Sequence, residues 1–440
     1  MKKLAILPNH PRARRWSAAL IASAIALGAC LLSYDNVEAQ IRQNRIERLN
    51  ARIENVYTAD YQDMADDNLK TEKSQAAATE DDIFVKENPY GTNTTSLYVY
   101  FTTDDAVSVS ERRKLAQKPA LTLSSVLRGE FMTKFETYTL DQFPLRDSFR
   151  RLKAVTLLDV LQEKDNNGIY LADGYAAKLD PSIDEASVQH AADRFQLVYD
   201  RYLAGTDAKV FAAVIPDKNA FLARQNGYPA YDPAELSALL AQSMPYASMI
   251  DLTPALSLDS YYHTDLHWRQ EALLPVARTL AKALGVTLTE DYETITADQP
   301  FYGVYCGQSA LPLEPEPLRY LTNDTLRGCT VYDYETGSEL PVYDLQQLAG
   351  EDAYAVFLSG SKALLTITNP AAKTDRELVV FRDSFASSLT PLLAGAYAKI
   401  TLVDIRYLQP ERLGTWLTFD TQDVLFLYSA PVLNSSETIR

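Results

Sequence analysis

Histidine is scarce in this sequence: its 440 residues include four, at His10, His190, His263 and His267. Any imidazole base or metal ligand must come from these positions. His10 precedes a long apolar run, and His190 lies in a stretch with helical periodicity where a partly exposed side chain is expected. The sequence therefore leaves His263 and His267 as the candidates for histidine chemistry.

Cysteine is also sparse, with three residues and no Cys-x-x-Cys pair, which excludes a cysteine-based metal cluster. Cys30 lies in an apolar stretch near the N-terminus. Cys306 and Cys329 would form a disulfide in an oxidising compartment or otherwise remain buried thiols, and the sequence leaves both possibilities open.

Positive charge is in deficit, with 42 Lys and Arg against 58 Asp and Glu, a net charge of -16 and a pI of about 4.8. Such a field repels nucleic acid and anionic membrane surfaces, so neither is expected as a partner of the folded part. The apolar fraction of 47% and the aromatic fraction of 10% are typical of a globular protein. The length allows one large domain or two ordinary ones.

One long apolar run stands near the N-terminus, from Trp16 to about Leu32, after a cluster of basic residues and before Asp35 and Glu38. This charge asymmetry favours export of the remaining chain by the positive-inside rule. Residues 1–39 are predicted to be a signal peptide or membrane anchor, which makes the protein extracytoplasmic, either membrane-anchored or secreted.

Three fates of this segment fit the residues. Val37-Glu38-Ala39 offers small residues for signal peptidase, Leu27-Gly28-Ala29-Cys30 resembles a lipobox, and the run can remain as an uncleaved anchor, which we favour. A buried N-terminal helix is a fourth possibility, against which the flanking charges argue.

Residues 40–95 are predicted to be a helical stalk followed by an acidic linker. Ile46, Leu49, Ile53 and Val56 recur at spacings of three and four, as on one face of a helix. From 59 to 95 the chain is acidic and poor in bulky residues, a composition typical of spacers.

Residues 96–440 are predicted to form one α/β domain. Apolar strands at 209–215, 378–381, 400–403 and 424–428 alternate with helical patterns at 183–203, 270–284 and 384–398. This alternation predicts a three-layer sandwich around a mainly parallel sheet. The stretch of about 286–375 is rich in Tyr, Pro, Gly and Thr and is predicted to be a small, mostly β, peripheral insertion.

Ser384 stands where an apolar strand ends and a helical pattern begins. The carboxyl edge of a parallel sheet is where ligands bind in such folds. Free backbone N–H groups at the start of the helix would be candidate oxyanion donors. The alternative is that Asp383 or Ser384 merely caps that helix.

His267 follows Asp265 by two positions, a spacing that lets the carboxylate hold the imidazole tautomer in an extended or turn backbone. Trp268 would then cover the site. Two alternatives stay open: His263, Asp265 and His267 can share one face of a strand and bind a metal, or they form a polar cluster in the core.

Five stretches carry a combined pattern: Asp141-Gln142-Phe143-Pro144-Leu145-Arg146-Asp147, Pro216-Asp217-Lys218, Thr264-Asp265-Leu266-His267-Trp268, Phe381-Arg382-Asp383-Ser384-Phe385 and Asp404-Ile405-Arg406-Tyr407. Together they resemble the DHHW family, exported bacterial proteins related to SGNH hydrolases and to alginate O-acetyltransferase proteins. The resemblance covers about 96–440 and implies an SGNH-like fold. By position it implies Ser384 as nucleophile, His267 as base and Asp265 as its orienting acid, with no metal or organic cofactor.

The sequence departs from the family pattern at two positions. Leu266 stands where the family name has its first His, and Arg382 replaces the Gly of a Gly-Asp-Ser motif. Arg382 is expected to crowd the serine or to supply positive charge to the oxyanion. With Trp268 and Arg406 it makes up the predicted set of substrate-binding residues.

The resemblance implies an extracytoplasmic serine acyltransferase or esterase acting on O-acetyl groups of a cell-surface polysaccharide. A membrane protein that delivers acyl groups would be a further partner. The alternative from another class is a non-catalytic envelope protein that binds polysaccharide or scaffolds an export complex. The distance between Ser384 and His267 discriminates between the two, because only an enzyme needs them in contact.

Overall fold

The computed structural model describes residues 107–108, 113–143, 146–288, 291–311, 313–350 and 352–440. The predicted N-terminal segment at 1–39 and the stalk and linker at 40–95 lie outside these ranges and remain predictions. Within these ranges, no helix combines the length and the apolar character needed to cross a membrane.

The described residues fall into two compact units, one with Val107 and Lys114–Gln142 and one with Ser108, Arg113 and Phe143–Arg440. In the first, α4 (Leu123–Leu127) is capped by the Thr122 side chain, and α5 (Glu130–Asp141) starts after Gly129. Two short strands, β1 (Val107–Ser108) and β2 (Arg113–Lys114), each include a point in the sequence where one unit ends and the other begins. The second unit begins with α6 (Arg146–Val155) and holds all the predicted site residues.

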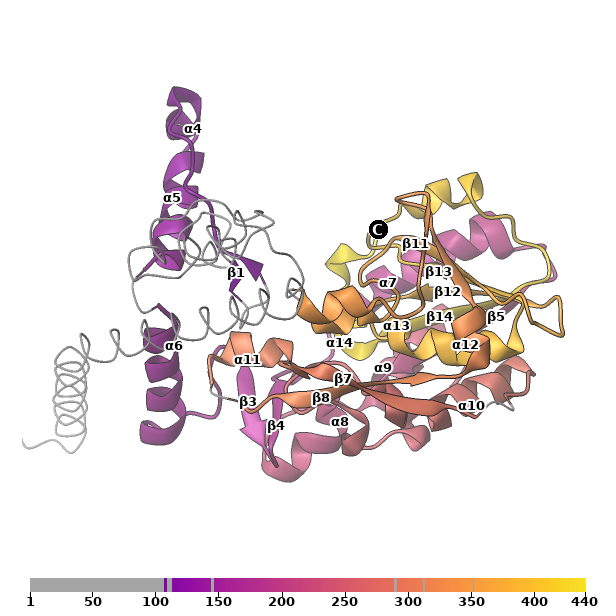
Figure 1. Ribbon diagram of the computed structural model, residues 1–440, viewed down its shortest axis with the longest axis horizontal. Coiled ribbons are helices and arrows are strands. Elements are labelled where there is room, and N and C mark those ends of the chain that lie inside the picture. The colour runs from indigo at the N-terminus through magenta and orange to yellow at the C-terminus, as the bar shows by residue number, and fades with distance from the viewer. Residues whose placement is uncertain (1–106, 109–112, 144–145, 289–290, 312, 351) are drawn as a thin grey trace, which may run out of the picture. The chain divides into compact units, whose positions relative to one another are not determined.

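An eight-stranded sheet forms the centre of the second unit, with strand order β10-β9-β11-β13-β12-β14-β5-β6 (Figure 1). Neighbours from β13 through β12, β14 and β5 to β6 pair in parallel. The strands are β5 (Lys209–Ile215), β6 (Ser248–Met249), β9 (Thr330–Asp333), β10 (Ser338–Leu340), β11 (Leu364–Thr368), β12 (Glu377–Arg382), β13 (Lys399–Val403) and β14 (Asp423–Ser429).

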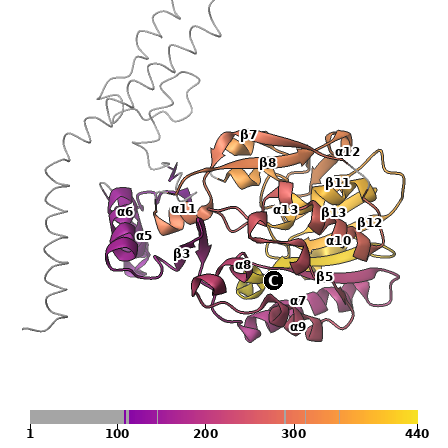
Figure 2. The same cartoon turned by 90° about the horizontal axis from the view of Figure 1, so that it is seen from below.

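Helices cover both faces of this sheet, because its central strands are apolar on both sides. In β12, Leu378 and Val380 enter one core with α10 (Leu274–Leu284) and α13 (Ala386–Leu389). Val379 and Phe381 enter the other, with α7 (Glu185–Val198), α9 (Pro233–Ser243) and α14 (Ala430–Leu433). Figure 2 shows α7 and α9 on one side of β5 and α10 on the other. The predicted α/β fold around a large sheet is confirmed.

The prediction that 286–375 is peripheral is wrong for three strands. β11 pairs antiparallel with β13 and with β9, and β10 adds to β9, so they extend the central sheet. Val331, Leu365 and Ile367 are buried in the same core as β12. Within the described part of this stretch, β7 (Glu293–Phe301) and β8 (Glu316–Thr322) form an antiparallel pair separate from the central sheet. Helix α11 (Val304–Ser309) lies between these two strands in the chain, and α12 (Asp324–Gly328) follows β8.

Two further features differ from expectation or settle an alternative. The helix predicted over 384–398 is only α13, after which a 3₁₀ helix spans Thr390–Ala396, because Pro391 has no N–H to continue the α-helical bonding. Cys306 and Cys329 are both buried thiols, and no disulfide joins them.

The second unit also contains the hairpin of β3 (Ile169–Ala172) with β4 (Tyr175–Lys178) and the short helix α8 (Asn219–Leu222).

Candidate active site

Ser384 lies two residues after the end of β12, at the carboxyl edge of the parallel strands. It is half-buried, whereas its neighbours Asp383 and Phe385 are fully enclosed. The Asp383 carboxylate accepts the Phe385 N–H at 3.0 Å and the Ser429 N–H at 2.7 Å, which ties the turn to the end of β14. The turn is therefore braced by Asp383, and the Ser384 hydroxyl is not used as a helix cap.

The Ser384 hydroxyl instead meets His267, with 2.8 Å between Oγ and Nε2. On the other side of the ring, His267 Nδ1 lies 2.6 Å from Asp265 Oδ1, which also accepts the His267 backbone N–H at 3.0 Å. A carboxylate can only accept, so Nδ1 carries the hydrogen and Nε2 is left as the acceptor for the serine hydroxyl. The structure brings the three predicted catalytic side chains into one hydrogen-bonded chain.

The second oxygen of Asp265 is held by the segment that opens α11. Val304 N–H donates to Asp265 Oδ2 at 2.8 Å, and Gly303 N–H donates to the Thr264 hydroxyl at 2.9 Å. A Cβ on Gly303 would lie 2.0 Å from the Thr264 carbonyl carbon and 2.3 Å from the Asp265 nitrogen. Only glycine permits this approach, and the approach is what orients the carboxylate.

Glu316, at the start of β8, fixes the same turn from another side. Its Oε1 accepts from the Thr264 N–H and hydroxyl, both at 2.7 Å, and its Oε2 accepts the His263 N–H at 2.8 Å. Three charge-assisted hydrogen bonds therefore hold the backbone that precedes Asp265.

The imidazole of His267 is enclosed by aromatic rings. The Tyr354 ring stacks on it with centroids 3.9 Å apart and an interplanar angle of 11°, and the Phe385 ring centroid lies at 4.8 Å. The Tyr354 hydroxyl bonds Ser388 Oγ at 2.8 Å, and burial raises the pKa of that phenol far above its usual value. Tyr354 is thus neutral, and its ring fixes the plane of the imidazole.

Trp268 does not cover the site as expected. It is fully buried, and its Nε1 donates to the Phe385 carbonyl and the Ser388 hydroxyl, each at 3.0 Å. The indole therefore links the histidine turn to the serine turn from beneath and presents no surface to a ligand. The expectation of substrate contact is corrected to a packing role.

Arg382 is likewise fully buried, so the expected contact with a substrate or oxyanion is not met. Its guanidinium donates to Ser387 Oγ at 3.0 Å and to the Lys362 carbonyl at 3.3 Å. Burial lowers the pKa of this guanidinium, and Asp404 opposes that shift. Arg382 is thus enclosed at the end of β12 and is not presented to a ligand.

Arg406 keeps part of its surface exposed but is committed to Asp404. Its Nε and Nη2 meet the two carboxylate oxygens at 2.9 and 2.6 Å. Burial would lower the pKa of Arg406, but the hydrogen bonds and charge of Asp404 raise it above the ordinary value. Substrate binding by Arg406 stays a prediction.

The metal alternative needs His263 to converge with Asp265 and His267. His263 is exposed instead and packs on Tyr175, with ring centroids 4.1 Å apart. Across the described ranges, no group of three or more His, Cys, Asp or Glu side chains is arranged to hold a metal ion.

Among solved structures, the chain is similar to a DHHW family protein from Eubacterium siraeum, with a TM-score of 0.53, 21% identity, and coverage of 62% of this chain and 95% of that one. The chain has the fold of a DHHW family protein. The resemblance noted in the sequence is thus confirmed at the level of the fold.

Two more distant structures also match. Bacillus cereus PatB1 with a sulfonyl adduct has a TM-score of 0.47 and 17% identity over 60% of this chain and 95% of that one. The O-acetyltransferase domain of Pseudomonas putida AlgJ has a TM-score of 0.35 and 13% identity over 61% and 92%. Such TM-scores are too low to bear on the site. No protein-family model matches the chain, and no curated protein matches it significantly in sequence.

Gly303, Glu316 and Tyr354 are the site residues that sequence reasoning missed. All three fall in 286–375, the stretch expected to be peripheral. Gly303 carries a local signal only as a glycine, the residue whose missing Cβ lets another backbone approach closely. The isolated glutamate and the tyrosine, one of 27, carry none.

Proposed function

We propose that this protein is an extracytoplasmic serine acyltransferase or esterase that acts on O-acetyl groups of a cell-surface polysaccharide. The observation that carries the proposal is the contact of His267 with both Ser384 and Asp265, at 2.8 and 2.6 Å. A non-catalytic scaffold has no need for a serine, an imidazole and a carboxylate in that order.

In the proposed reaction, Ser384 Oγ attacks the acyl carbonyl carbon while His267 Nε2 takes the hydroxyl proton. Asp265 stabilises the imidazolium that forms and stays ionised. Collapse of the tetrahedral intermediate breaks the ester bond, and the leaving alcohol takes the proton from His267. A sugar hydroxyl or water then attacks the acyl-enzyme and gives its proton to His267. The bond between the acyl carbon and Ser384 Oγ breaks, His267 returns the proton to Oγ, and the acetylated sugar or acetic acid leaves.

The oxyanion donor we assign is the N–H of Ser384. The helix start was expected to offer several free donors, but the Phe385, Ala386 and Ser387 N–H groups donate to Asp383 Oδ1, the Asp383 carbonyl and the Ser384 carbonyl. One well-placed donor contributes roughly 10²–10³ in rate.

The test is hydrolysis of a chromogenic acetate ester by the full-length chain beside Ser384→Ala and His267→Gln. Both variants should lose at least about 10³-fold in kcat, whereas Ser361→Ala, at an exposed serine, should match the wild type. Equal rates for the wild type and Ser384→Ala would refute the nucleophile. Addition of a chelator should leave the rate unchanged. With an O-acetyl donor and a sugar acceptor, transfer to the sugar distinguishes a transferase from an esterase.

A further inference from the structure

Lys218 is a fully buried lysine just after β5, and the proposed reaction does not use it. Its ammonium donates to two backbone carbonyls, that of Tyr262 at 2.7 Å and that of Ala176 in β4 at 2.9 Å. These charge-assisted bonds join the end of a central strand to the hairpin and to the segment that precedes Asp265.

The two residues that receive these bonds also hold the two sides of the histidine turn. Tyr262 N–H donates to the His267 carbonyl at 3.1 Å, and Ala176 N–H donates to the His263 carbonyl at 2.8 Å. Tyr261 and Trp268 form an antiparallel bridge beside them. A single residue, Tyr262, therefore connects the ammonium of Lys218 to the backbone of His267.

The surroundings of this ammonium are aromatic rather than anionic. It lies 5.1 Å from the Tyr305 ring centroid and 5.8 Å from that of Tyr175, and no ion pair joins it to a carboxylate among the residues that the structure describes. Burial lowers the pKa of Lys218 to about 8, and the charges of Asp217, Asp265 and Glu316 oppose that shift.

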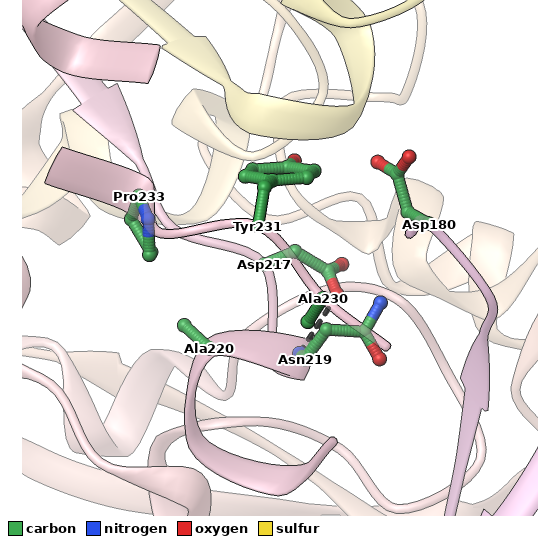
Figure 3. A pocket seen from close by; sticks show the side chains of 7 residues that line it. All are labelled: Asp180, Asp217, Asn219, Ala220, Ala230, Tyr231 and Pro233. Atoms are coloured by element: carbon green, nitrogen blue, oxygen red, sulfur yellow. Dashed lines mark hydrogen bonds between the residues drawn. The ribbon is translucent and has the colours of Figure 1, made fainter. Parts of the chain in front are cut away.

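The neighbouring Asp217 is committed elsewhere. Its carboxylate accepts the Asn219 N–H at 2.8 Å, and Figure 3 shows it beside Asn219 at a small cavity also lined by Asp180 and Tyr231. The cavity measures about 10 Å³, room for about one water molecule. Burial removes water from the Lys218 ammonium, and the Asp217 carboxylate does not replace that water with a direct ion pair.

We propose that Lys218 is a positioning residue that sets the His267 backbone relative to Ser384 by holding the Tyr262 carbonyl. This inference rests on the proposed function. An apolar side chain of similar length would fill the same space without the cost of a buried charge, but it would leave two buried carbonyls without donors. The structure keeps the costly group where backbone displacement would separate the base from the nucleophile.

The activity test compares Lys218→Met with Lys209→Met, a control at an exposed lysine of β5, in the full-length chain. We expect Lys218→Met to lower kcat about 10- to 100-fold at an unchanged KM, because a displacement of about 1 Å in a catalytic group has that effect. Lys218→Gln keeps an N–H₂ donor group on a shorter, uncharged side chain and should recover part of the loss. A kcat of Lys218→Met equal to that of Lys209→Met overturns the proposal.

A second readout does not depend on activity. The His267 Nδ1 proton, held between nitrogen and Asp265, should give a low-field proton NMR signal that His267→Gln removes. We expect Lys218→Met to shift or abolish this signal and Lys209→Met to keep it. If the wild type lacks Ser384-dependent activity, the proposed function fails, and this signal still decides the role of Lys218.

A Lys218 variant that fails to fold also has a defined meaning for the proposal. If Lys218→Met does not fold, Lys218→Gln is judged by the same two readouts. If neither folds while Lys209→Met does, Lys218 serves the fold alone and the positioning role is refuted.

Discussion

Gly303→Ala is the substitution that most directly tests how Asp265 is oriented. The new methyl group would lie 2.0 Å from the carbonyl carbon and oxygen of Thr264 and 2.3 Å from the Asp265 nitrogen, where real Cβ contacts are essentially never under 3.0 Å. Both neighbours are backbone, so no side chain can rotate away. One of the two segments must move by at least about 1 Å.

The expected magnitude follows from what that movement breaks. The Val304 N–H to Asp265 Oδ2 bond, at 2.8 Å, and the Gly303 N–H to Thr264 hydroxyl bond, at 2.9 Å, both join these two segments. Overpacking of this kind costs about 1–3 kcal/mol of stability. A catalytic group displaced by about 1 Å can lose on the order of 10²-fold in rate.

The assay measures kcat on the chromogenic acetate ester together with the free energy of unfolding from urea titrations. Gly328→Ala is the matched control, because a Cβ there meets nothing within 4 Å. We expect a fall in kcat of about 10²-fold and a loss of stability for Gly303→Ala, and neither for Gly328→Ala. Wild-type kcat and stability in Gly303→Ala would refute the close approach and the role given to it.

Three further changes have defined outcomes. Burial raises the pKa of Asp217 from 3.8 to about 6, so the folded chain binds that proton more tightly than the unfolded one. The free energy of unfolding should therefore fall by roughly 2 kcal/mol as pH rises from 4 to 6, and Asp217→Asn should flatten this part of the urea-unfolding profile. Glu316→Gln places an amide N–H₂ among backbone donors near Thr264 and should cost about 1–2 kcal/mol with a lower kcat, whereas an unchanged kcat would contradict its brace. Arg376→Met removes the 2.6 Å contact with Asp423 and should lower the free energy of unfolding, measured in urea, by about 2–3 kcal/mol. Its kcat should stay unchanged, because both residues lie at the end of the sheet opposite Ser384.

Much of the second unit follows from local patterns. The continuous apolar run of β5 occupies the predicted residues, 209–215, because a strand buried on both faces needs no alternation. Helix α7 buries Val188, Ala191, Ala192, Phe195 and Val198, the stripe that its 3.6-residue period predicts. Helix α10 ends at Gly285, whose φ of 69° is one that glycine adopts without strain.

Patterns failed where the side chains carry little local signal. The strands β9 to β11 are short, and the long connection 341–363 separates β10 from β11, so nothing in their sequence shows that β11 pairs with β13 and with β9. Arg382 is charged and was expected at the surface of the site, yet it is enclosed at the end of β12, where Ser387, the Lys362 carbonyl and the charge of Asp404 hold it. Pairing and enclosure of this kind depend on partners far away in the chain.

The sequence by itself determined the pair of Asp265 and His267, since two positions suffice for the carboxylate to meet the ring, and it determined that His267 or His263 must be any imidazole base. Only the tertiary structure decided that Ser384, 117 residues away, meets that ring. It also decided that Gly303 and Lys218 hold the turn, because backbone contacts between distant segments arise from the path of the whole chain.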